Sequence, residues 1–154
     1  MTIEWVFQTP KPDINCQWLE NQLLSVLPKL RNQTDISPSL LNLELTVVFV
    51  SMEMGAQLNK QFRGRDSATD VLSFEGDRHH SLGEVVLTGS VVANQAEQHQ
   101  LSFADETLYL VLHGILHLLG FEHENGGPQA ERMMTLQDEL FAELCERAGS
   151  CAKR

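Results

Sequence analysis

The chain is 154 residues long, a length that suits one compact domain, and 42% of its residues are hydrophobic, which is ordinary for a globular protein. Acidic residues outnumber basic ones by 21 to 11, and the net charge of -10 argues against a protein that coats nucleic acid without sequence preference. No apolar stretch reaches the roughly 18 residues of a membrane span, and the first residues show no secretory signal, so we expect no membrane segment and a cytoplasmic location.

The first half of the chain alternates strand and helix patterns. Residues 2–8 and 43–50 show the loose or strict period-two alternation of strands. Between them, apolar residues at helical spacing over 18–27 predict an amphipathic helix that begins at Asp13 or Asn15 and ends near Pro28. Ser51 is a typical N-cap for a short helix over 52–62.

The second half predicts two more strands and three more helices. Residues 63–68 form a polar loop, 69–74 and 83–88 have strand character, and 90–100 form a helix. Ser102 and Asp105 resemble a capping box that opens a helix over 103–119, which is apolar on most faces and therefore predicted to be the buried central helix. Pro128 begins a last helix to about residue 147, with Gly149 after it. We expect one α+β domain over residues 1–154.

Three histidines near the middle of the second half form a candidate metal site. His113 and His117 are four residues apart, so on a helix they share one face, about 6 Å apart along the axis. Gly120 can adopt a positive φ, which ends the helix and turns the chain so that His123 returns beside the first pair. Three neutral imidazoles around one point predict a transition-metal site, most naturally one zinc ion per chain with a coordination position left open.

Other residues with metal-binding or thiol chemistry have simpler interpretations. Cys16, Cys145 and Cys151 are widely spaced and form no Cys-x-x-Cys pair, which argues against a thiolate zinc site and favours reduced thiols without a functional role. The three remaining histidines show no ligand spacing, and we interpret them as surface residues: His79, His80 and His99.

The histidine spacing equals that of the metzincin peptidases, with one difference that matters for the chemistry. The glutamate that serves as general base in those enzymes is replaced by Gly114, which cannot accept a proton. Glu122 and Glu124 flank the third histidine and are candidate replacements. The simpler interpretation of each is a solvated surface carboxylate or a hydrogen-bond partner of a ligand, above all for Glu124.

The remaining motif is a basic loop in a chain that is otherwise poor in positive charge. Lys60, Arg63 and Arg65 cluster there, and on their own they would be read as solvated surface charges. They belong to a longer set of residues that, together with the histidine run 113–123, closely resembles the motifs of the YbeY family. That set is Asn59, Phe62-Arg63-Gly64-Arg65-Asp66, Thr69-Asp70-Val71-Leu72-Ser73-Phe74 and Leu82-Gly83-Glu84. Phe121 and Glu122 stand where the family often has tyrosine and aspartate, and neither is a candidate ligand.

This resemblance implies a zinc-dependent, single-strand-specific endoribonuclease. The family matures ribosomal RNA, notably the small-subunit 3′ end, and takes part in ribosome quality control. The resemblance implies a zincin-like α+β domain with a four-stranded mixed sheet and a buried central helix that bears metal ligands. It assigns His113, His117 and His123 to the metal and a catalytic role to Arg63. We further expect Lys60, Arg63 and Arg65 to contact RNA through its phosphates.

Two other functions stay open at this point, a zinc peptidase or other hydrolase, and a non-catalytic ribosome-assembly factor whose metal is structural. The nucleophile is equally open between metal-bound water and the RNA 2′-hydroxyl. Because the net charge is -10, we expect weak non-specific RNA binding and recognition through the ribosome or a ribosome-bound protein.

Overall fold

The computed structural model describes residues 1–149; Cys151, interpreted above as a reduced thiol, lies outside them. The helices and strands follow in this order: β1 (Thr2–Phe7), α1 (Cys16–Ser25), α2 (Leu27–Arg31), the 3-10 helix η1 (Pro38–Asn42), β2 (Glu44–Val50), α3 (Met52–Arg63), β3 (Val71–Glu75), β4 (Ser81–Thr88), α4 (Gly89–Gln98), α5 (Phe103–Leu118) and α6 (Pro128–Ala148).

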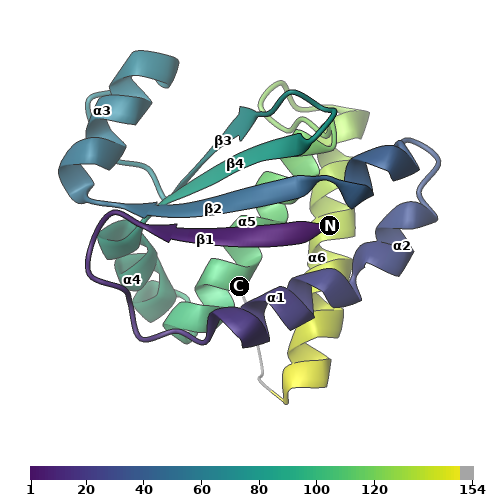
Figure 1. Ribbon diagram of the computed structural model, residues 1–154, viewed down its shortest axis with the longest axis horizontal. Helices are drawn as coiled ribbons and strands as arrows, with labels where there is room; N and C mark the ends of the chain where they lie inside the picture. The colour runs from purple at the N-terminus through teal and green to yellow at the C-terminus, as the bar shows by residue number, and fades with distance from the viewer. Residues whose placement is uncertain (150–154) are drawn as a thin grey trace.

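The strands form one mixed sheet in the order β1-β2-β4-β3. Strands β1, β2 and β4 run parallel, and β3 pairs antiparallel with β4, which leaves β3 at an edge. Helices α1, α4, α5 and α6 gather on one side of the sheet, and α3 stands at one end on the other side (Figure 1). The four-stranded mixed sheet and α+β class expected from the sequence are confirmed.

Alternation along the strands creates two apolar faces. In β2, Leu45, Val47 and Phe49 are fully buried and belong to the main core beneath the sheet. Val48 and Val50 point to the opposite face, into a smaller cluster that Leu58 and Phe74 partly cover. Period-two patterning therefore predicted the strand, and the structure shows that it is buried on both faces.

Helix α5 is the central buried helix, as predicted. Of its 16 residues, 12 are buried, and it contacts β3, β4, α1, α4 and α6. The Ser102 hydroxyl accepts a hydrogen bond from the Asp105 backbone N–H at 3.0 Å, the predicted N-cap. A helix covered on nearly all sides places its few polar side chains where they must find partners or a ligand.

The first helical region is where the sequence interpretation was wrong. The pattern over 18–27 predicted one helix, whereas the chain forms α1 and then the separate short helix α2, with Pro28 in its first turn. A proline ring cannot fit against the carbonyl four residues earlier, so α1 cannot continue through Pro28. Of the two N-cap candidates, Asn15 is the one that accepts from the Trp18 N–H, at 3.0 Å. The short helix η1 was not predicted.

Membrane-spanning helices and disulfides are the two remaining features on which the sequence bears. Over residues 1–149 no helix combines the length and the hydropathy of a membrane-crossing segment. Neither Cys16 nor Cys145 forms a disulfide within the same range.

Candidate metal centre and basic cleft

The C-terminal turn of α5 brings the third histidine back to the first two. Gly120 has φ +105°, and its N–H donates to the His117 carbonyl at 3.0 Å. The Phe121 N–H donates to the Leu116 carbonyl at 3.0 Å, and the Phe121 side chain is buried. This pair of hydrogen bonds is the Schellman arrangement that ends helices at glycine, and it reverses the chain within two residues of His123.

The three imidazoles converge as the spacing predicted. The ring centroids of His113, His117 and His123 lie 4.7 to 4.9 Å apart, and the Nε2 atoms of His113 and His117 are 3.1 Å apart. One ligand atom from each ring lies within 4.8 Å of the others, and within residues 1–149 this is the one group of histidine, cysteine or acidic side chains with that geometry. A tetrahedral zinc ion with bonds of about 2.05 Å separates its ligand atoms by about 3.3 Å.

Hydrogen bonds donated by the Nδ1 atoms set the tautomers of two of these rings. His117 Nδ1 donates to the Phe121 carbonyl at 3.0 Å, and His113 Nδ1 donates to the Oε1 of Gln137 at 2.8 Å. Both Nε2 atoms therefore carry lone pairs, which face one another at 3.1 Å. A cation bound between them removes that repulsion.

The electrostatics of the cluster also suit a cation. Burial, together with the neighbouring imidazoles of His113 and His123, lowers the pKa of His117 to about 4, so His117 is neutral at pH 7. His123 Nδ1 is buried and has no hydrogen-bond partner among residues 1–149. Neutral imidazoles and a buried nitrogen without a protein partner fit a divalent transition metal.

The structure gives a packing reason for Gly114. A Cβ atom at this position would lie 2.6 Å from the Cγ2 of Val85 and 3.1 Å from the Oγ of Ser73. The glycine therefore lets α5 approach β4 and β3 closely, and a glutamate side chain has no room there. The missing peptidase base noted in the sequence is a consequence of how α5 packs on the sheet.

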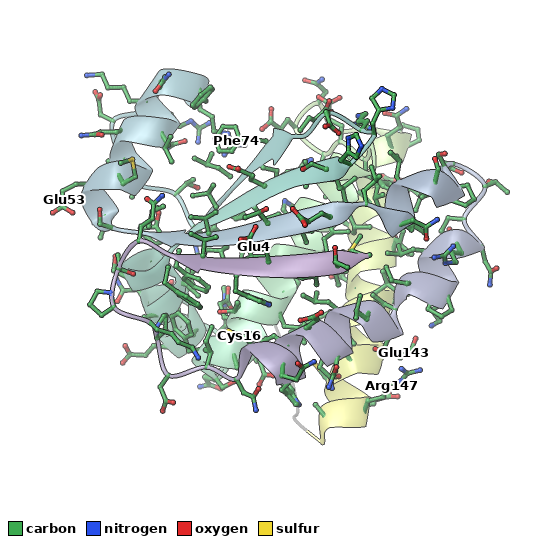
Figure 2. The ribbon with its side chains drawn as sticks, viewed as in Figure 1. Glu4, Cys16, Glu53, Phe74, Glu143 and Arg147 are labelled. Atoms are coloured by element: carbon green, nitrogen blue, oxygen red, sulfur yellow. The ribbon has the colours of Figure 1, made fainter. Side chains whose placement is uncertain are left out.

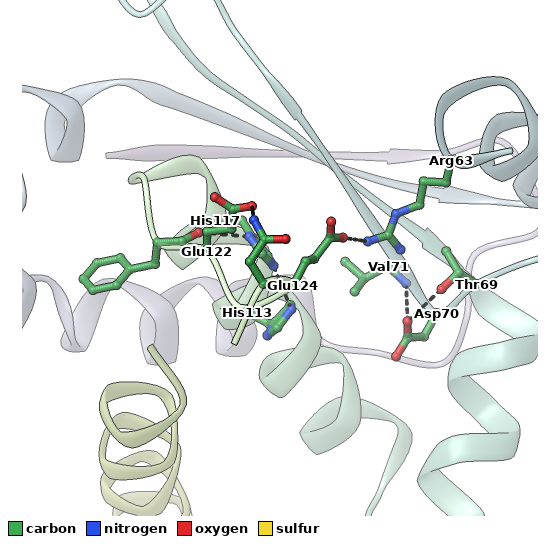
Figure 3. A network of polar contacts seen from close by, with 10 residues as sticks. Arg63, Thr69, Asp70, Val71, His113, His117, Glu122 and Glu124 are labelled. Carbon is green, nitrogen blue, oxygen red and sulfur yellow. Dashed lines mark hydrogen bonds and ion pairs between the residues drawn. The ribbon is translucent and has the colours of Figure 1, made fainter. Parts of the chain in front are cut away.

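Arg63, from the end of α3, reaches the same site. Its Nη2 donates a hydrogen bond of 2.6 Å to the Oε1 of Glu124, the residue that follows His123 (Figure 3). This hydrogen bond, together with the charge of Arg63, lowers the pKa of Glu124. Glu124 is therefore an ionised partner of Arg63, and Glu122, the other candidate base, is exposed and accepts from Asn125 Nδ2 at 3.2 Å.

The histidines and Arg63 line one cavity of about 740 Å³. Strand β3 forms one wall along its whole length, and Phe62 and Glu124 lie at the same cavity. Of the three residues expected to contact RNA, only Arg63 belongs to the lining. Lys60 is exposed and pairs with Asp66 at 3.3 Å, and Arg65 is exposed outside the cavity.

Two polar residues differ from what sequence reasoning indicated, one at the histidine cluster and one elsewhere in the fold. Gln137 is fully buried in α6, among the apolar residues of that helix, and a polar residue at such a position is the one signal in the sequence that could have singled it out. His99, interpreted as a surface residue, is only partly exposed, and its Nδ1 lies 3.0 Å from Oε2 of the fully buried Glu106. His79 and His80 are exposed, as predicted.

Comparison with known proteins places these features in a family. The sequence profile of the family described as Endoribonuclease YbeY matches residues 5–145. An Endoribonuclease YbeY from Bdellovibrio bacteriovorus is 34% identical over 134 residues, covering 87% of this chain and 89% of that protein. One from Persephonella marina is 38% identical over 109 residues, covering 67% and 71%. The solution structure of TM1509 from Thermotoga maritima superposes with a TM-score of 0.62 at 28% identity, covering 95% of this chain and 91% of that one.

Proposed function

The chain belongs to the Endoribonuclease YbeY family, and on that ground we propose that it is a zinc-dependent endoribonuclease that cleaves single-stranded RNA. The observation that carries this proposal is the convergence of three imidazoles with Arg63 in one cleft. Three neutral nitrogen ligands suit one zinc ion per chain, held by His113, His117 and His123, and leave a coordination position for substrate.

The residues in and around the cleft have different roles in phosphodiester cleavage. When bound, zinc supplies a Lewis acid for a phosphoryl oxygen and lowers the pKa of coordinated water to about 7. Arg63 binds the phosphate through its planar fork of donors, exchanging the Glu124 carboxylate for a phosphate oxygen. Lys60 and Arg65 contact the RNA backbone outside the cleft.

We propose ribosomal RNA as the substrate, with maturation of the small-subunit 3′ end and ribosome quality control as the roles. The net charge of -10 supports recognition through a partner, because such a protein binds free RNA weakly. That partner is the ribosome or a ribosome-bound protein, and this substrate implies a cytoplasmic location.

The test measures metal content and RNA cleavage on the same sample. The wild-type protein should carry one zinc ion and cut a single-stranded oligonucleotide of the 3′-end sequence faster than its duplex. His117→Ala should lose metal and activity, whereas Arg63→Ala should keep the metal and lose about 10²–10³-fold in rate, the range for removing one group that stabilises developing charge. Lys29→Ala, which removes a cation paired with Glu143 on α6, is the matched control.

Circular dichroism must show that each variant retains its fold. Cleavage at the wild-type rate by metal-free Arg63→Ala protein would overturn the proposal.

The acidic charge also favours a second candidate, a ribosome-assembly factor in which the metal only holds the fold. In that case chelation should lower the melting temperature strongly, and the metal-loaded protein should show no nuclease activity.

A zinc peptidase is the third candidate function. Cleavage of casein, tested beside cleavage of RNA, would reveal it, and the packing at Gly114 argues against it because no glutamate base fits there.

A further inference from the structure

Phe62 is an exposed aromatic side chain at the entrance to the cleft. Its exposed fraction is 57%, and the other large apolar side chains exposed within residues 1–149 are methionines: Met52, Met54 and Met134. It is the residue before Arg63 and lines the same cavity as the three histidines. Neither the metal site nor the phosphate contact uses it.

The ring of Phe62 is held in place by a second aromatic residue. It makes an edge-type contact with Phe74, with ring centroids 4.8 Å apart and an interplanar angle of 69°. Phe74 belongs to β3, packs into the smaller apolar cluster, and lies on the side of the sheet where α3 stands (Figure 2). An edge-type contact covers at most one face of the Phe62 ring, and the exposed fraction of 57% leaves part of the ring available to a ligand.

The chemistry beside this ring indicates what it binds. The next residue, Arg63, presents a guanidinium suited to phosphate, and a flat apolar ring beside a phosphate-binding group matches a nucleotide. The cavity of about 740 Å³ lies within the range of sites that enclose small ligands, so it has room for a base as well as a phosphate. Bases in a duplex are already stacked and paired, whereas bases of a single strand are free to stack on an aromatic side chain.

We propose that Phe62, buttressed by Phe74, is a stacking platform for one unpaired nucleobase next to the phosphate bound by Arg63. This inference rests on the proposed RNA substrate. It gives the preference for single strands a structural basis, because a paired base cannot reach the ring.

The test measures binding to the metal-loaded protein of a 2′-O-methyl oligoribonucleotide, whose integrity is checked afterwards. Phe62→Ala should weaken binding by about 5- to 150-fold, the range reported for one base stacked on an aromatic side chain. Phe62→Tyr keeps the ring and should bind within about twofold of wild type, and Phe62→Leu should resemble Phe62→Ala. Met54→Ala removes an exposed apolar side chain of the same helix outside the cavity and should change nothing.

Abasic oligonucleotides identify the base that stacks. One abasic position should weaken binding to the wild type and leave binding to Phe62→Ala unchanged, because the partner ring is already absent. A Phe62→Trp variant adds a direct signal, since its fluorescence should be quenched by the intact oligonucleotide above the background from Trp5 and Trp18, and not by the one that lacks the stacking base.

The outcomes separate this inference from the proposed function. Wild-type protein that neither binds nor cuts RNA overturns both. Wild-type protein that cuts RNA while Phe62→Ala and Phe62→Leu bind it equally well overturns the platform alone. The platform is also overturned if Phe62→Ala weakens binding equally for the intact and for every abasic oligonucleotide. In that case the ring would support the packing of the protein and would not contact a base. As a control, the metal content and melting temperature of each variant should equal those of the wild type, so that differences in binding are not caused by loss of metal or fold.

Discussion

A single amide determines how the first histidine of the cluster is oriented. Gln137 reaches from α6 to His113 Nδ1 and directs His113 Nε2 toward the other two rings. It is fully buried, and its own Nε2 has no partner within residues 1–149. Gln137 lies more than twenty positions along the chain from His113, so the last helix is part of the candidate metal centre.

Removing this amide should weaken metal binding without removing a ligand. We expect Gln137→Leu to lower zinc affinity by about 10- to 100-fold, as for other partners of metal-binding histidines, because the His113 ring loses its fixed orientation. Gln137→Glu keeps an acceptor and should bind zinc at least as tightly as wild type. Competition with a chromophoric chelator measures both, with the exposed Asp138→Asn as control. Equal affinity of the Leu variant and wild type would contradict this role.

The lowered pKa of His117 makes the metal-free protein sensitive to acid. The folded-state pKa of about 4 lies below the usual 6.5, so between these values the unfolded chain binds more protons than the folded one. Stability from this group is thus complete above about pH 6.5 and falls as the pH drops toward 4. The melting temperature of the metal-free protein should decline over this window. NMR titration of the His117 ring should give a midpoint near 4, and a midpoint near 6.5 would refute the expectation.

At the scale of elements, the contact of α5 with the sheet constrains both stability and chemistry. Gly114 sits where α5 lies closest to Val85 of β4 and Ser73 of β3. Two of the three histidines belong to this helix, so the close contact also determines how far they stand from the cavity wall formed by β3.

Adding one methyl group at this contact should destabilise the protein. We expect Gly114→Ala to lower the free energy of unfolding by about 1–3 kcal/mol, the usual cost of overpacking a core, because its Cβ meets Val85 at 2.6 Å. Chemical denaturation measures the change. The double variant Gly114→Ala, Val85→Ala should be less destabilised than the sum of the two single variants, since the smaller side chain removes the clash. Strict additivity would show that the contact is not the cause.

The whole molecule combines an acidic surface with a small basic region at the cleft. Arg63 lines the cavity, and Lys60 and Arg65 lie outside it on α3 and the loop that follows. Because the net charge is -10, the acidic surface repels RNA phosphates, and only these few basic side chains attract them. Salt screens the carboxylates that lie farther than about 8 Å from the bound phosphate.

RNA binding by the isolated protein should therefore be weak and depend on few phosphates. If the three basic residues each contact one phosphate, the plot of log affinity against log salt should have a slope of about -2, from roughly -0.7 per contact for a single strand. Lys60→Ala and Arg65→Ala should each reduce the slope by about 0.7. Fluorescence anisotropy at several salt concentrations measures this. A slope that neither substitution changes would remove these residues from the interface.

Local patterns were enough to predict much of this protein from its sequence. Period-two alternation predicted β2, and Ser102 and Gly120 predicted the ends of α5, because these signals depend on backbone geometry within a few residues. The spacing of the three histidines predicted their convergence for the same reason, since one helix turn and one glycine reversal are both local.

Only the tertiary structure could show which contacts distant residues make in and around the histidine cluster. The hydrogen bond from His113 to Gln137, the ion pair of Arg63 with Glu124 and the lack of space at Gly114 each join segments that are far apart in the chain. Such contacts depend on how α3, α5, α6 and the sheet pack together, and packing follows from the shape of the whole core. The sequence by itself therefore determined the histidine pattern of the candidate metal site, and the assembled fold decided what surrounds it.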